Sequence, residues 1–246
     1  MGDVLRHTLA GLFVLSLSTL PAAAEEVIRL AHDDPFAPFA MSKGGRSEGI
    51  VIDILQEALA RGTVKPVFIP AHMDKVQDLV KAGEADGLAL LAVNPERQQV
   101  YDFSDPLVIT GGALFVGSPR PAPAGLQELE GKRVVTPRKG PLAGYIQRQF
   151  PKVDLLTVED YPAALKAVLD GTAEAAALNP QVGMYLAGQL FPGRFTSPSR
   201  LFLELPLAAA VLKGTHASFL EQLNAGLSRI RAEGAYARII EKWGGR

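Results

Sequence analysis

The stretch MDKVQDLVKAGEADGLALLAVNPER, residues 73–97, indicates how this chain folds. Its first half places apolar residues at helical spacing and stops at Gly83, a residue type that commonly ends helices. The next segment, GLALLAV at residues 87–93, has the composition of a strand that is buried on both faces. A helix followed by such a strand is typical of a parallel sheet covered by helices, so the stretch predicts an α/β fold.

The same plan occurs again in YPAALKAVLDGTAEAAALNPQVGMY, residues 161–185. Both stretches run from a helix through a glycine, an acidic residue and an apolar strand to Asn-Pro and a second helix. A C-terminal pair of helices, broken near Gly234, is predicted as well. Further strands are predicted over residues 27–31, 65–71, 111–117, 153–158 and 205–214, and a loop is predicted around Gly44 and Gly45. The pattern indicates two similar lobes, each built from alternating strands and helices.

Residues 1–24 differ from the rest of the chain. A short start with Arg6 and His7 leads into 13 mainly apolar residues, 8–20, and then to Pro21 and three alanines. This pattern is typical of a secretory signal peptide, with cleavage near Ala24. The apolar run is shorter than the roughly 20 residues that a membrane-spanning helix needs. We therefore expect a periplasmic protein with a mature length of 246 − 24 = 222 residues.

Composition argues against several classes of function. The formal net charge is −1 and the chain has no block of Lys and Arg, which argues against a nucleic-acid partner. The chain has no cysteine, so a disulfide framework, a thiolate nucleophile and a Cys-ligated metal are excluded. The four histidines lack metal-ligand spacing. We expect neither a metal nor a cofactor.

Arg97 is the first candidate for a binding residue. Pro95 suits the first position of a helix with Asn94 as its cap, so a helix is predicted here with Arg97 in its first turn. Free backbone N–H groups and the helix dipole favour an anion at that place. The segment also follows the strand at residues 87–93, and open α/β sheets bind ligands at the carboxyl ends of strands. The alternative is a solvated surface arginine.

Several short motifs, taken in order, resemble one family. They are PFAPF, GIVIDIL, GEAD, NPER, YDFSDP, LEGKRVV, DGTAEAAALNP and GAYARIIEKWGG. The chain resembles the periplasmic solute-binding proteins of family 3, which serve ABC transporters of polar amino acids. The resemblance implies a type II periplasmic-binding-protein fold of two lobes, each a mainly parallel sheet flanked by helices, joined by two hinge strands. Lobe 1 would comprise residues 25–108 plus 208–246, and lobe 2 residues 109–207.

The resemblance also implies site residues in lobe 1. Arg97 matches the arginine that clamps the α-carboxylate of the ligand. Phe36 matches an aromatic wall of the cleft and Asp33 a polar position in the same loop, with a core phenylalanine and a loop-capping aspartate as the alternatives. Met73 takes the place of a frequent aromatic, and Ala92 that of a threonine whose hydroxyl contacts the carboxylate.

Lobe 2 departs further from the family pattern. Gly140-Pro141 replaces a Gly-Thr or Gly-Ser that binds the carboxylate, and Asn179 replaces the aspartate that pairs with the ligand's ammonium. An amide cannot neutralise a buried cation, so a free amino acid would need Asp33 as a substitute partner. Arg138 could add a second positive charge and favour a dicarboxylate, or could be a solvated loop arginine.

The predicted function is that of a monomeric binding protein. It would capture an amino acid or a small organic anion and deliver it to an ABC transporter permease. A ligand-sensing module is the first alternative. The second is an exported, dehydratase-like enzyme on the same scaffold, with Asp33, His32, His72 and Glu204 as its candidate acids and bases. These four show no recognisable catalytic spacing, so we expect no enzyme.

Overall fold

The computed structural model describes residues 25–138 and 141–243, so the predicted signal peptide and Gly140 lie outside the described residues. Within these ranges ten strands form one sheet, in the order β4-β1-β5-β12-β7-β10-β8-β9, with β6 on β12 and β11 on β7. The strands are β1 (Glu26–Asp33), β2 (Met41–Lys43), β3 (Arg46–Glu48), β4 (Val64–Ala71), β5 (Gly87–Ala92), β6 (Tyr101–Phe103), β7 (Val108–Gly117), β8 (Arg133–Pro137), β9 (Asp154–Val158), β10 (Ala175–Leu178), β11 (Phe195–Thr196) and β12 (Leu201–Leu212). The helices are α1 (Ile50–Leu59), α2 (Val76–Lys81), α3 (Pro141–Gln149), α4 (Tyr161–Leu169), α5 (Pro180–Leu190), α6 (Ala217–Ala232) and α7 (Ala235–Lys242), with short 3-10 turns at Arg97–Gln99 and Leu126–Leu129.

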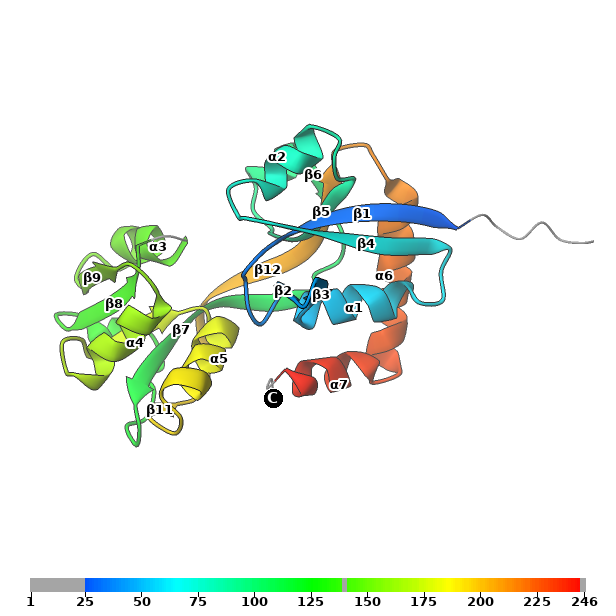
Figure 1. Cartoon of the computed structure of the whole chain (residues 1–246). Coiled ribbons are helices and arrows are strands. Elements are labelled where there is room, and N and C mark those ends of the chain that lie inside the picture. The colour runs from blue at the N-terminus through cyan, green and yellow to red at the C-terminus, as the bar shows by residue number, and fades with distance from the viewer. Residues whose placement is uncertain (1–24, 139–140, 244–246) are drawn as a thin grey trace, which may run out of the picture.

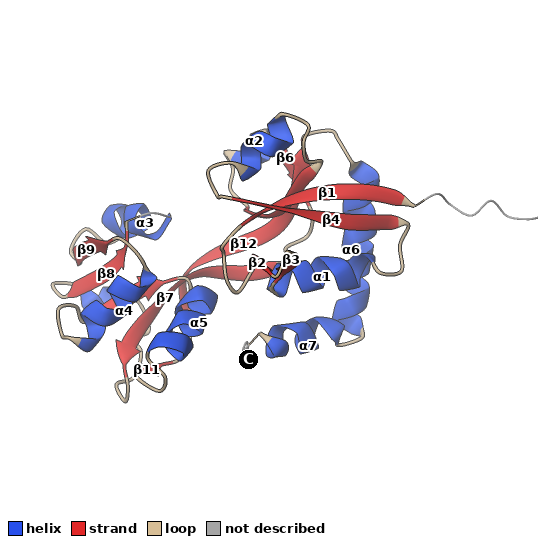
Figure 2. Cartoon of the chain, viewed as in Figure 1, coloured by secondary structure: helices blue, strands red, loops and turns tan. Residues whose placement is uncertain are grey.

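The elements gather into two lobes that β7 and β12 connect (Figure 1). Strands β4 and β1 lie with α1, α2, α6 and α7 in the first lobe, and β8 and β9 lie with α3, α4 and α5 in the second (Figure 2). Strand β5 pairs with β1, and β10 pairs with β8, so each belongs to the lobe of its partner. Within each lobe these three strands are parallel. The predicted two-lobe α/β fold is therefore confirmed, while the exact residues at which one lobe ends and the other begins stay a prediction.

Lobe 1 is held together by apolar packing and by ion pairs, of which the one between Arg29 and Asp86 links two strands. The inner face of α1 is fully buried against α6, and Gly226 is required there because a Cβ would overlap the carbonyl of Ala58. Arg29 on β1 donates two hydrogen bonds to Asp86, which lies just before β5. Nε is 3.0 Å from Oδ2 and Nη2 is 2.6 Å from Oδ1. These bonds with Arg29 hold the pKa of Asp86 below its usual range and align the two strands.

Two elements differ from the sequence-based prediction. The segment expected to be a loop around Gly44 and Gly45 is the hairpin β2–β3, and both glycines have positive φ, 57° and 76°. A two-residue Gly-Gly turn is a recognised hairpin signal, which short polar flanking strands concealed. The first strand also runs to Asp33, two residues beyond its predicted end, because β4 pairs with it along its whole length.

The sheet has β4 as one of its edges. Pro66 and Pro70 lie on this strand, and proline is tolerated in a sheet mainly at edges because it has no N–H to donate. The side chain of Lys65 is also partly exposed there. Among the described residues, the helices are too short or too polar for any of them to cross a membrane.

The crossing between the lobes depends on Gly111. Strands β7 and β12 are antiparallel, with Thr110 opposite Leu205 and Gly111 opposite Glu204. Gly111 has φ of 152°, and a Cβ at this position would overlap the carbonyl of Leu203. The two hinge strands therefore approach each other more closely than a side chain would allow.

We expect Gly111→Ala to lower the free energy of unfolding by about 3 kcal/mol, since it adds a steric overlap to a strained φ. Gly117→Ala is the matched control, because this glycine ends the same strand and the nearest atom to an added Cβ is 4.0 Å away. Urea unfolding of both variants measures the difference. Equal stability of the two variants would contradict the close approach at Gly111.

Candidate functional site

The strand ends of the two lobes point toward each other. Strand β5 runs antiparallel to β12 and ends with Ala92 opposite Leu207, on the side of lobe 2. Strand β10 runs antiparallel to β7 and ends with Leu178 opposite Ala113, on the side of lobe 1. Because β1 and β4 are parallel to β5, and β8 and β9 to β10, all six carboxyl ends face the other lobe. Ligands bind at such strand ends in α/β proteins.

The distance between the two sets of ends follows from the hinge ladder. Leu207 pairs with Val108, so the end of β5 lies level with Val108 of β7. The end of β10 lies level with Ala113, which is 113 − 108 = 5 residues further along β7. At about 3.3 Å per residue this separation is about 16 Å along the strand. Loops that extend from each end can therefore reach one ligand from both sides.

The predicted site residues follow these ends. Asp33 and Ala92 are the last residues of their strands, and the others lie in the segments that come next. The full set is Asp33 at the end of β1 and Phe36 after it, Met73 after β4, Ala92 at the end of β5 and Arg97 after it, Arg138 after β8 and Asn179 after β10. Five of them belong to lobe 1 and two to lobe 2.

Arg97 lies in a single 3-10 turn, Arg97–Gln99, and not in the predicted α-helix. The prediction of an α-helix was wrong because the chain enters β6 at Tyr101, where it pairs with β12. Only one turn fits between Pro95 and this strand. The predicted cap is present, since Asn94 Oδ1 accepts a hydrogen bond from Arg97 N at 2.8 Å. The guanidinium folds back over β5 and donates from Nη1 to the carbonyl of Ala92 at 2.9 Å. This bond uses one of the five N–H groups of the side chain.

Asp33 has a buried oxygen, Oδ1, without a hydrogen-bond partner among the described residues. Burial raises the pKa of this carboxyl, while the charges of His32, His72 and Arg97 act in the opposite direction. A buried acceptor without a donor is costly and therefore uncommon. The charge of Arg97 thus acts on a carboxylate that has an acceptor oxygen without a donor. Arg97 itself is a side chain with several N–H donors.

His32 attaches the hairpin β2–β3 to the segment that carries Asp33. This histidine is 1% exposed, with Nδ1 at 2.9 Å from the Asp33 carbonyl and Nε2 at 2.7 Å from Ser47 Oγ. Because a carbonyl can only accept, Nδ1 carries a proton. Asp34 Oδ1 adds a second tie by accepting from Ser42 N at 2.9 Å. Sequence reasoning considered His32 only as a catalytic candidate and missed this positioning role.

The three apolar candidate residues, Phe36, Met73 and Ala92, differ in how far they are buried. Phe36 packs on the lobe 1 core, with its ring centroid 5.1 Å from that of Phe39. It also remains partly exposed, so core packing and a place on the site's wall are compatible. Met73 is 53% exposed, which makes it an adaptable surface group. The methyl side chain of Ala92 offers no hydroxyl, but its carbonyl orients Arg97.

Arg138 and Asn179 differ in how firmly the fold holds them. The Arg138 side chain is 68% exposed and its Nη1 lies 3.8 Å from Glu159 Oε2, a loose surface pair. Asn179 is the N-cap of α5, and its Oδ1 accepts from Val182 N at 3.1 Å. The fold therefore fixes the orientation of Asn179, whereas the Arg138 side chain is held only by this loose pair.

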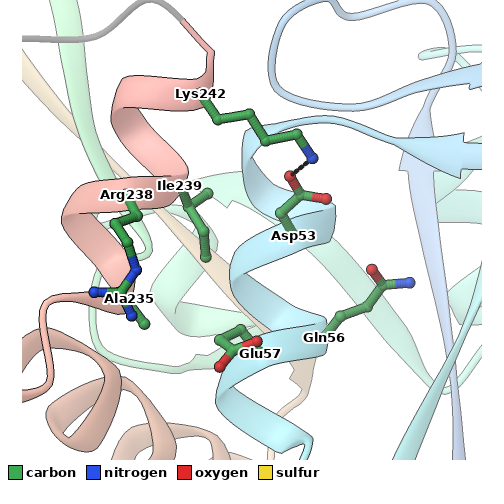
Figure 3. A pocket seen from close by; sticks show the side chains of 7 residues that line it. All are labelled: Asp53, Gln56, Glu57, Ala235, Arg238, Ile239 and Lys242. Carbon is green, nitrogen blue, oxygen red and sulfur yellow. Dashed lines mark hydrogen bonds and ion pairs between the residues drawn. The ribbon is translucent and has the colours of Figure 1, made fainter.

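A separate hollow of about 430 Å³ lies between α1 and α7 (Figure 3). Its walls are Asp53, Gln56, Glu57, Ala235, Arg238, Ile239 and Lys242, so none of the predicted site residues lines it. Asp53 Oδ2 accepts from Lys242 Nζ at 2.7 Å and from Trp243 Nε1 at 2.9 Å. This aspartate therefore fastens the C-terminal helix to α1. Among the described residues no group of three or more acidic or histidine side chains is placed to hold a metal ion.

Two α/β lobes on a pair of crossing strands, with polar groups at the facing strand ends, define the type II periplasmic-binding-protein class. The chain belongs to the bacterial extracellular solute-binding proteins, family 3, whose sequence model matches residues 28–246. The predicted family is therefore confirmed.

The relatives include both sensors and transport proteins. The chain is 27% identical to the virulence sensor protein BvgS of Bordetella bronchiseptica over 230 residues, which cover 91% of this chain but only 18% of that sensor. It is 24% identical to the ABC transporter arginine-binding protein 1 of Escherichia coli, covering 94% of this chain and 96% of that protein. The open crystal structure of substrate-binding domain 2 of Lactococcus lactis GlnP matches with a TM-score of 0.76 at 23% identity, over 90% of this chain and 97% of that domain.

The raised pKa of Asp33 predicts how a substitution changes stability with pH. The folded protein binds this proton more tightly than the unfolded chain, whose carboxyl keeps its ordinary value of 3.8. The ionised carboxylate therefore lowers stability above its raised native pKa, and this cost vanishes below 3.8, where both states are protonated. We expect Asp33→Asn to raise the Tm of the ligand-free protein by a few degrees near neutral pH and to lose this advantage in acid.

Asp34→Asn is the matched control in the same thermal scans. The backbone N–H of Ser42 lowers the pKa of Asp34, so its ionised form stabilises the fold above the ordinary carboxyl range. Asp34→Asn is expected to lower the Tm or leave it unchanged near neutral pH. A similar rise in both variants would show that general charge, and not the burial of Asp33, causes the effect.

Proposed function

We propose that this chain is an exported binding protein that encloses an amino acid or a small organic anion between its lobes. The observation that carries the proposal is the opposition of the strand ends across the two hinge strands. A ligand that contacts both sets of ends binds the closed arrangement better than the open one, and this difference in affinity drives closure.

Arg97 is the proposed carboxylate clamp. The bond to Ala92 orients the guanidinium at the end of β5, and its remaining N–H groups can bind a carboxylate with two parallel hydrogen bonds. Phe36, Met73 and Ala92 would form the wall around the ligand. Their contribution is mainly apolar contact, because none of the three carries a charged side chain.

The charge class of the ligand depends on Asp33. Its buried Oδ1 needs a donor, and a ligand ammonium or hydroxyl would supply one. In that case Asp33 compensates for the amide at position 179 and an amino acid can bind. Arg138, exposed and loosely paired, can swing toward a second carboxylate, which supports the dicarboxylate alternative.

Two roles are open for the closed form. The similarity to amino-acid-binding proteins over nearly their full length supports delivery to an ABC transporter permease in the periplasm, with the chain acting as a monomer. The similarity to part of the BvgS sensor supports a ligand-sensing module as the second candidate. Both roles use the same closure and require no catalysis.

A thermal-shift screen of ligand-stripped protein against amino acids, dicarboxylates and other small anions tests the binding site. We expect one of these classes to raise the Tm, because a ligand that binds only the folded state stabilises it. Arg97→Ala should weaken binding of that compound about 100-fold or more, since it removes a bidentate charged contact. The exposed Arg200→Ala is the control and should bind normally. Unchanged binding by Arg97→Ala would overturn this placement of the site.

A deletion strain distinguishes transport from sensing. If the chain delivers its ligand, uptake of the radiolabelled stabilising compound should fall by about tenfold when the gene is removed, because a permease then receives the ligand only by diffusion. Unchanged uptake together with a lost transcriptional response to the compound would favour the sensing role.

A further inference from the structure

Thr110 is a buried polar residue at the crossing between the lobes, with 2% of its surface exposed. It lies opposite Leu205 of β12 and directly precedes Gly111, the residue with the unusual φ. Strand β10 of lobe 2 pairs with β7 from Ala113 to Phe115. A side-chain bond from Thr110 to the start of α5 therefore spans the part of β7 that contains Gly111.

Two such bonds reach the start of α5, which lies beside β7 (Figure 1). Asn179 Nδ2 donates to Thr110 Oγ1 at 2.7 Å, and Thr110 Oγ1 donates to Gln181 Oε1 at 2.6 Å. The directions follow from the cap, because Val182 N can only donate and so requires the oxygen of Asn179 on its side. The Thr110 hydroxyl accepts one bond and donates the other, which makes it the central member.

We propose that Thr110, Asn179 and Gln181 form a brace that sets the balance between the open and the closed arrangement. A rotation of lobe 2 about Gly111 would move α5 relative to Thr110 and would change the lengths and angles of both bonds. Short hydrogen bonds tolerate little change in length or angle. The brace therefore favours the arrangement in which it is intact, and Asn179 is a positioning residue of the hinge.

The brace also regulates the proposed binding site, and in this respect the inference rests on the proposed function. Apparent affinity depends on how much of the protein is in the binding-competent arrangement before the ligand arrives. A change in the brace therefore changes the apparent affinity without any change in the groups that contact the ligand. The amide at 179, in place of a carboxylate, would thus act through the hinge as well as through charge.

The experiment is a distance measurement on ligand-free protein. The chain has no cysteine, so Lys81→Cys on α2 and Gln147→Cys on α3 introduce two unique sites for spin labels, both exposed and on opposite lobes (Figure 1). Thr110→Val keeps the shape of the side chain and removes both bonds. We expect it to change the population ratio of the two arrangements by about tenfold, seen as a second interlobe distance in pulsed electron resonance.

Two further variants separate the brace from a loss of stability. Thr136→Val removes a hydrogen bond of another buried threonine in lobe 2, whose Oγ1 donates to the Ala177 carbonyl at 2.7 Å, and it should leave the distance distribution unchanged. Thr110→Ser keeps the hydroxyl and should restore the original distribution. If Thr110→Val gives the same distribution as Thr136→Val, the brace is overturned. Because no ligand is added, this result is independent of the ligand screen, so failure of the brace and failure of the proposed function are distinguishable.

Discussion

Two antiparallel strands carry the chain between the lobes, and their register determines where everything else lies. Each strand pairs with a lobe sheet on its outer side, so the ladder of β7 and β12 fixes the direction of both sheets. The facing carboxyl ends, the position of Arg97 and the brace at Thr110 all depend on this ladder. Gly111 allows the two strands to approach at the crossing because it has no side chain. The arrangement of the two lobes therefore depends on this one glycine.

The candidate site contains less favourable contacts than the core that supports it. The core of lobe 1 has residues with no exposed surface, such as Ile54, and a bidentate pair between β1 and β5. At the site, by contrast, Asp33 has a buried oxygen without a donor in the part of the chain that the structure describes, and Met73 is exposed. Binding sites commonly retain such unfavourable groups because a ligand relieves them. The hairpin β2–β3 and its contact with His32 hold the unfavourable carboxylate in place.

Much of the fold could be predicted because its strands are short apolar runs between glycine-ended helices. The strand at residues 87–93 and the break at Gly234 are examples of strong local signals. The 3-10 turn at Arg97 escaped prediction because pairing of the following strand decides it. The hairpin at Gly44 escaped prediction because its two strands are short and polar. The brace could not be predicted either, because residues 110 and 179 are 69 positions apart and no local pattern links them. Which residues follow strand ends could be predicted, but their hydrogen-bond partners could not.

The prolines of β4 have a consequence for aggregation. A sheet edge with free donors and acceptors invites the same edge of a second molecule to add to it, which is how ordered aggregates begin. Pro66 and Pro70 interrupt the row of donors along this edge. The interruption of this row protects the chain from edge-to-edge growth at β4, because an added strand would find donors missing at two positions.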